Sequence, residues 1–187
     1  MLPSVGEVRL KIVFLVRHAK SSWKDSSLRD KDRPLKKRGA RDLKLLRPAL
    51  TAHEHKPEHV FSSDARRAAE TAKTLAAFYG LKKSRVTFTN GLYAASPGEI
   101  LDFIRNRDDD LRSIMIVGHN PEMSEAADLL GEEPLEVLLP TSAVVCMSFL
   151  IDSWEELREN SGHLEFFEYP RKYKQEVPGS TNTSTGS

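Results

Sequence analysis

The chain has 187 residues, of which 39% are hydrophobic and 29% are charged, a composition typical of one globular domain. Its 28 basic and 27 acidic side chains leave a formal net charge of +1. This balance argues against nucleic acid or an anionic membrane as a partner, because both leave a basic footprint. The single cysteine, Cys146, excludes an intramolecular disulfide and fits a reducing compartment. With no signal-peptide pattern and no run of ~20 apolar residues, we predict a cytoplasmic protein.

The first half of the chain reads as two strand–helix units. An extension over residues 1–10 precedes an apolar run at 12–16, which predicts a buried strand. An apolar stripe with helical periodicity follows, formed by Gly39, Leu43, Leu46 and Leu50. A short strand at 60–61 leads to a second helix, which Ser63 would cap at its start and Gly80 would end.

The second half repeats this pattern. A weak strand at 86–88 precedes a helix that begins with the capping-box sequence Ser96-Pro97-Gly98-Glu99. A buried strand at 114–117 comes next. The Asn120-Pro121 pair then predicts the start of a fourth helix, which Gly131 would end.

Two segments rich in β-formers, 143–151 and 164–169, are expected to pair around a turn near Ser161 and Gly162. Cys146 lies in the first of them and is expected to be a buried strand residue. Strands that alternate with helices predict a single α/β domain over residues 11–173, with a mostly parallel sheet covered by helices on both faces. Residues 174–187 are polar and predict a disordered tail.

Three predicted strands are followed by cationic or imidazole side chains. Arg17 and His18 follow the first strand, Arg67 comes soon after the second, and His119 follows the strand at 114–117. In a doubly wound sheet the carboxyl ends of the strands line the ligand crevice, where helix N-termini also favour anions. Because guanidinium groups bind phosphate oxygens bidentately, this set predicts a phosphate site.

Four segments resemble the motifs of the histidine phosphatase superfamily, and in particular of its SixA-type phosphohistidine phosphatase branch. In the family's order they are Leu15-Val16-Arg17-His18-Ala19-Lys20-Ser21-Ser22-Trp23, Asp32-Arg33-Pro34-Leu35-Lys36-Lys37-Arg38-Gly39, Ser62-Ser63-Asp64-Ala65-Arg66-Arg67-Ala68-Ala69-Glu70-Thr71-Ala72 and Gly118-His119-Asn120-Pro121. The resemblance covers roughly residues 12 to 150. It implies a phosphoglycerate mutase-like fold and a phosphatase that uses neither a metal nor another cofactor.

The resemblance also implies a role for each member of the cationic set. His18 would accept the phosphoryl group, Arg17 and Arg67 would bind its oxygens, and His119 would complete the pocket and stabilise the transferring group. Alignment on the distance to the family threonine selects Arg67 and leaves Arg66 as a neighbouring control.

Elementary chemistry supports a neutral His18 as the nucleophile. Imidazole has an unperturbed pKa of ~6.5, and flanking arginines disfavour its protonation. The ring nitrogen that does not attack needs a hydrogen-bond acceptor, which we expect to be a backbone carbonyl. Residues 91–99 offer no clear carboxylate to protonate an alkoxide, because Glu99 is better explained as a helix cap. This absence favours phosphohistidine, whose leaving imidazole is far less basic than an alkoxide.

Further residues have less certain assignments. Lys20, Ser21, Arg38 and Asn120 are predicted to bind substrate, although the first three also fit a solvated surface. Asp32 and Arg33 are expected to form an ion pair that fixes their loop. Trp23 fits either internal packing or a contact at the rim of the site.

The sequence therefore predicts a monomeric phosphohistidine phosphatase acting on a phosphorelay or carrier protein. Two alternatives stay open: a phosphatase or mutase for a small phosphorylated metabolite, and a phosphate-binding adaptor without turnover. The intact pair His18 and His119 favours an enzyme, since a binder needs arginines but no nucleophile.

Overall fold

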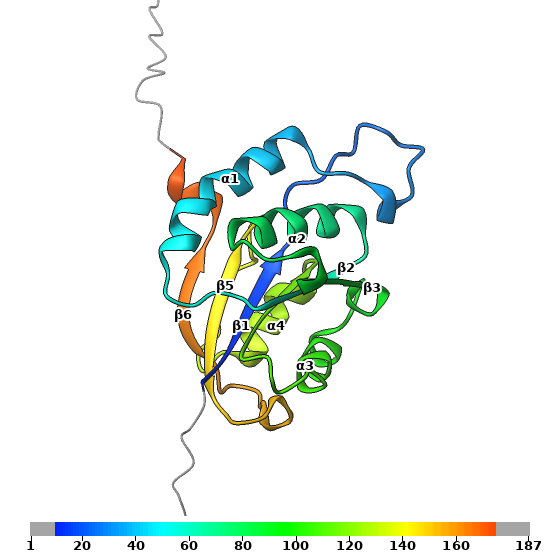
Figure 1. Ribbon diagram of the computed structural model, residues 1–187. Coiled ribbons are helices and arrows are strands. Elements are labelled where there is room, and N and C mark those ends of the chain that lie inside the picture. Colours follow the sequence, from blue (N-terminus) through cyan, green and yellow to red (C-terminus); the bar gives the residue numbers. More distant parts are fainter. Residues whose placement is uncertain (1–9, 175–187) are drawn as a thin grey trace, which may run out of the picture.

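The computed structural model describes residues 10–174, so the predicted extension and tail lie outside it except for Leu10 and Lys174. One six-stranded sheet has helices on both faces, as predicted (Figure 1). Its strands are β1 (Leu10–Arg17), β2 (His59–Ser63), β3 (Val86–Thr89), β4 (Ser113–Gly118), β5 (Val144–Leu150) and β6 (His163–Glu168). Its helices are α1 (Lys37–Ala52), α2 (Arg66–Phe78), α3 (Pro97–Arg105) and α4 (Glu122–Leu130).

The strand order is β3-β2-β4-β1-β5-β6. The pairs β3–β2, β2–β4 and β4–β1 are parallel, whereas β5 runs antiparallel to both β1 and β6. The predicted mostly parallel sheet and the pairing of its last two strands are thus confirmed. The connection between β5 and β6 is longer than the predicted turn near Ser161, because it runs over residues 151–162 and includes the 3-10 turn Trp154–Glu156.

Side chains of β1 alternate between two hydrophobic cores. Val13 and Leu15 pack with residues of α3 and α4, whereas Phe14 and Val16 pack with residues of α1 and α2. The predicted stripe of α1 is buried in the second core, as is Cys146 of β5. No helix in the described part of the chain is long and apolar enough to cross a membrane.

The structure confirms the predicted cap of α3 but not the predicted caps of α2 and α4. Ser96 and Glu99 form both bonds of the capping box at the start of α3, as expected. Ser63 does not cap α2, whose N-cap is Ala65, and Asn120 does not cap α4, whose N-cap is Pro121. In both cases the polar side chain is engaged near the strand ends instead, where the site described below is formed.

Candidate active site

The carboxyl ends of β1 and β4 bring the two candidate histidines together. Arg17 pairs with Gly118 in the parallel register, and the His18 amide donates to the Gly118 carbonyl at 3.0 Å. The next residue after Gly118 is His119, and the ring centroids of His18 and His119 lie 5.1 Å apart. The two rings at these strand ends are therefore separated by about the width of one phosphate group.

One tautomer of His18 follows from its contacts. The Nδ1 atom lies 2.7 Å from the Ala19 carbonyl, an acceptor, so Nδ1 carries the proton. The Nε2 atom accepts from Nε of Arg67 at 3.2 Å and thus holds a lone pair. Thr71 fixes this arrangement, because its hydroxyl accepts from the Ala19 amide and donates to the Arg67 carbonyl. The backbone acceptor expected from the sequence is the Ala19 carbonyl.

His119 adopts the complementary tautomer. Its Nδ1 lies 3.3 Å from Nη2 of Arg67, which can only donate, so the proton of His119 is on Nε2. That atom donates to the hydroxyl of Ser63 at 2.8 Å. The Ser63 side chain thus orients His119.

Both imidazoles are neutral at pH 7. Burial is the main cause that lowers the pKa of His18 to about 4, and the charges of Arg67 and Arg17 lower it further. Burial, His18 and Arg67 together lower the pKa of His119 to about 3. An uncharged His18 with its lone pair on Nε2 has the properties that a nucleophile needs.

Arg67 contacts both histidines and Asp30, and it is only 8% exposed. Its Nε and Nη2 face the two histidines, while Nη1 donates to the Asp30 carbonyl at 2.6 Å and Nη2 to the Asp30 carboxylate at 2.9 Å. The same carboxylate oxygen accepts from the hydroxyl of Tyr93 at 2.9 Å. Hydrogen bonds from Tyr93 and Arg67 hold the pKa of Asp30 below its usual range despite some desolvation.

Sequence reasoning missed Asp30. It lies in the 3-10 turn Asp30–Asp32 of the long segment between β1 and α1, which has no periodic pattern (Figure 1). The predicted pair of Asp32 and Arg33 is wrong. Asp32 pairs with Arg29 at 2.7 Å, whereas Nε of Arg33 lies 3.7 Å from the Asp30 carboxylate.

Arg33 also explains the place of Trp23. The guanidinium carbon of Arg33 lies 3.9 Å from the centroid of the Trp23 ring, which is otherwise exposed. Trp23 is thus a surface residue stacked on the loop that carries Asp30.

Arg17 and Asn120 meet at a single carbonyl. Nη1 of Arg17 donates to Leu139 at 2.6 Å, and Nδ2 of Asn120 donates to the same oxygen at 3.1 Å. Among the described residues, the buried Nε of Arg17 has no hydrogen-bond partner. Burial lowers the pKa of Arg17, and its charge lies close enough to His18 to lower the pKa of that ring.

The remaining predicted substrate-binding residues make contacts elsewhere. Lys20 is exposed and Ser21 forms an isolated bridge with Leu35. Arg38, on α1, lies 3.8 Å from the carboxylate of Asp42. The structure therefore joins Asn120 to the site through Leu139, whereas it does not bring Arg38 to the histidines.

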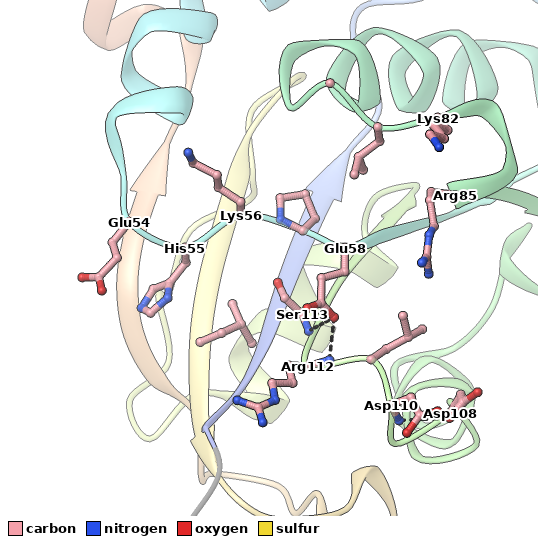
Figure 2. A pocket seen from close by; sticks show the side chains of 15 residues that line it. Glu54, His55, Lys56, Glu58, Lys82, Arg85, Asp108, Asp110, Arg112 and Ser113 are labelled. Carbon is pink, nitrogen blue, oxygen red and sulfur yellow. Dashed lines mark hydrogen bonds between the residues drawn. The ribbon is translucent and has the colours of Figure 1, made fainter.

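A separate pocket of about 1060 Å³ lies at the opposite end of the parallel strands, near their amino ends (Figure 2). Ile12, Glu58 and Ser113, which lie near the starts of β1, β2 and β4, help to line it. At about 3.3 Å per strand residue, Ile12 is roughly 20 Å from His18 along β1. The charges around this pocket are of both signs, so it lacks the cationic character of the histidine site.

The fold and the convergent cationic site are those of a phosphatase. The family model of the histidine phosphatase superfamily (branch 1) matches residues 13–100. An uncharacterized chloroplastic protein of Arabidopsis thaliana is 35% identical over 158 residues, which are 80% of this chain and 72% of that protein. The chain belongs to the histidine phosphatase superfamily.

Solved structures point to the SixA-type branch. A SixA protein from Agrobacterium tumefaciens is 25% identical with a TM-score of 0.70, covering 86% of this chain and 98% of that one. The protein histidine phosphatase SixA complexed with tungstate is 22% identical with a TM-score of 0.72, covering 87% and 99%. The predicted fold and the SixA-type resemblance are thus confirmed.

Proposed function

We propose that this chain hydrolyses phosphohistidine on a protein, through a covalent phosphohistidine intermediate on His18. The observation that carries the proposal is the state of the His18 ring. The Ala19 carbonyl accepts the Nδ1 proton, which leaves the lone pair on Nε2. This lone pair accepts from Nε of Arg67, and the His119 ring centroid lies 5.1 Å from that of His18. A binding module would need the guanidinium groups but not this fixed, uncharged imidazole.

The chemistry proceeds in two steps. In the first, Nε2 of His18 attacks phosphorus and the N–P bond of the substrate breaks. The phosphorylated ring of the substrate reacts as the imidazolium, with a proton on its other nitrogen, so it leaves as neutral imidazole. In the second, water attacks the phosphorylated His18, the Nε2–P bond breaks, His18 leaves as neutral imidazole with its proton on Nδ1, and inorganic phosphate is released with both protons of the water. Phosphoryl transfer depends mainly on positioning and on neutralising the equatorial oxygens. Arg67 and Arg17 are the charged groups we assign to that task, and His119, which is neutral and donates to Ser63, completes the pocket beside them.

The carboxylates near the site support the choice of a phosphoramidate substrate. Glu99 is occupied in the capping box of α3, as the sequence predicted. Asp30 is ionised at neutral pH because Tyr93 and Arg67 hydrogen-bond to its carboxylate, so it is not a proton donor in this arrangement. An alkoxide leaving group would need such a donor, whereas imidazole does not.

We further propose that the substrate protein is a phosphorelay or carrier protein in the cytoplasm and that the chain acts as a monomer without a metal. The competing substrate class is a small phosphorylated metabolite. Release of phosphate from a phosphohistidine peptide should exceed release from phosphoglycerates and sugar phosphates. Equal or faster hydrolysis of the metabolites would refute the proposed substrate.

Trapping the intermediate tests the enzyme against a phosphate-binding adaptor. Brief incubation with ³²P-labelled phosphohistidine peptide and quenching into alkali should leave label on the protein that acid removes, as expected for a phosphoramidate. His18→Ala should abolish both the label and turnover. His163→Ala is the matched control, because His163 is an exposed residue that pairs with Glu132 on the surface. Label that persists in His18→Ala would assign the nucleophile elsewhere.

A further inference from the structure

The guanidinium of Arg67 presents two edges to different partners. The edge formed by Nε and Nη2 faces the lone pairs of His18 and His119, at 3.2 and 3.3 Å. The edge formed by Nη1 and Nη2 faces Asp30, whose backbone carbonyl and carboxylate accept at 2.6 and 2.9 Å. The guanidinium fork is planar, so a partner that fixes one edge also fixes the direction of the other.

We propose that Asp30 is a positioning residue that clamps the outer edge of Arg67 and thereby aims its inner edge at the phosphoryl oxygens. When a phosphoryl group binds, its oxygens replace the imidazole lone pairs as acceptors at the Nε–Nη2 edge, while Asp30 keeps the Nη1–Nη2 edge. Asp30 thus acts through Arg67 and does not touch the reacting atoms. The inference rests on the proposed function only for its kinetic readout.

Asp30 and its 3-10 turn are themselves held in place by neighbouring residues. The hydroxyl of Tyr93 donates to the carboxylate oxygen that Arg67 uses, and Lys31 Nζ lies 5.3 Å from the Tyr93 ring centroid. Lys31 also bonds to Asp64 at 2.7 Å and to Asn90 at 2.8 Å, which ties the 3-10 turn to residues that follow β2 and β3.

A simple surface ion pair would not have this form. The side chain of Asp30 is 47% exposed, but that of Arg67 is buried, and one of its two bonds to Asp30 goes to the main chain. An exposed pair between mobile side chains contributes little. Here both acceptors belong to one residue of the 3-10 turn, and the buried cation also contacts both imidazoles.

The test compares Asp30→Ala and Asp30→Asn with Asp32→Asn. Asp32 is the matched control because it lies in the same turn and pairs with Arg29 on the surface. Measurements are kcat and KM on phosphohistidine peptide, tungstate affinity by calorimetry, and the melting temperature. We expect Asp30→Ala to lower kcat/KM about 10- to 100-fold, mainly in kcat, as for a misplaced catalytic group. Asp30→Asn, which keeps an acceptor oxygen, should lose less, and Asp32→Asn should stay within about twofold of wild type.

Tungstate binding and a double variant separate positioning from a structural effect. Asp30→Ala should weaken tungstate about tenfold, within the usual range of interaction between neighbouring residues. In an Arg67→Lys background, which has no fork to aim, the same change should cost less than about threefold. If the effects of Asp30→Ala and Arg67→Lys on tungstate affinity were fully additive, the proposal would be overturned. Tighter tungstate binding by Asp30→Ala would also overturn it, because Asp30 would then compete with the anion for Arg67. If Asp30→Ala fails to fold, Tyr93→Phe reports on the clamp through a smaller loss of the same kind.

The two proposals fail in different ways. Wild-type protein without phosphohistidine turnover, combined with weaker tungstate binding in Asp30→Ala, would refute the proposed function and leave the clamp intact. Wild-type turnover with Asp30→Ala indistinguishable from Asp32→Asn would refute the clamp and leave the function intact.

Discussion

Neighbouring arginines at the start of α2 allow a direct test of the site. Arg67 is buried and donates to both imidazoles, whereas Arg66 is paired with Glu70 one turn along the helix, at 2.8 Å, with 57% of its side chain exposed. Removing a preorganised charged donor typically costs ~3–4 kcal/mol of barrier. At 1.36 kcal/mol per factor of ten, Arg67→Ala should lower kcat/KM about 10²- to 10³-fold.

Arg66→Ala removes only a surface i,i+4 pair, which contributes ~0.3–0.5 kcal/mol to stability. Its kcat/KM should stay within about twofold of wild type. The assay is phosphate release from phosphohistidine peptide, with urea denaturation of both variants to show that each is folded. If Arg66→Ala proved the more damaging change, both the assignment of Arg67 and the reasoning from its contacts would be refuted.

Three further results are expected. His18 has a pKa of about 4 in the folded chain and ~6.5 when unfolded, so the unfolded state gains its proton first as pH falls, and up to ~3 kcal/mol of stability is lost between about pH 6.5 and 4. His18→Asn should reduce this loss when the free energy of unfolding, measured by urea denaturation, is plotted against pH. An unchanged slope of that plot would contradict the assigned pKa. Gly39→Ala should destabilise the fold by ~1–3 kcal/mol, because an added Cβ would lie 2.5 Å from the Lys20 carbonyl oxygen. Gly98→Ala is the control, because its added Cβ would meet nothing within 4 Å. Similar melting temperatures for the two variants would count against this packing of Gly39. Vanadate should inhibit phosphate release as a phosphate mimic while a chelator leaves the rate unchanged, and inhibition by the chelator would show that these side chains do not act alone.

Much of the fold follows from local patterns. The apolar run at 12–16 has no polar alternation, which predicts a strand buried on both faces, and it forms the centre of β1. The stripe of α1 and the capping box of α3 depend on contacts within a few residues of each other, which a sequence displays directly. Ser63 and Asn120 were misjudged as caps because their side chains bond to groups far along the chain, namely His119 and the Leu139 carbonyl.

The sequence by itself determined which side chains gather at the strand ends, because parallel strands must place their carboxyl ends at one edge of the sheet. Arg17, His18 and His119 follow from that rule. The backbone acceptor for the His18 ring follows instead from the need of its second nitrogen for a hydrogen-bond partner. Only the tertiary structure decided that Asp30 completes the site. Asp30 and Arg67 are 37 positions apart, and Asp30 reaches Arg67 through an irregular loop with no period to reveal its direction. Local physics predicts the helices and strands, whereas the path of such a loop depends on contacts that exist only once the chain has folded.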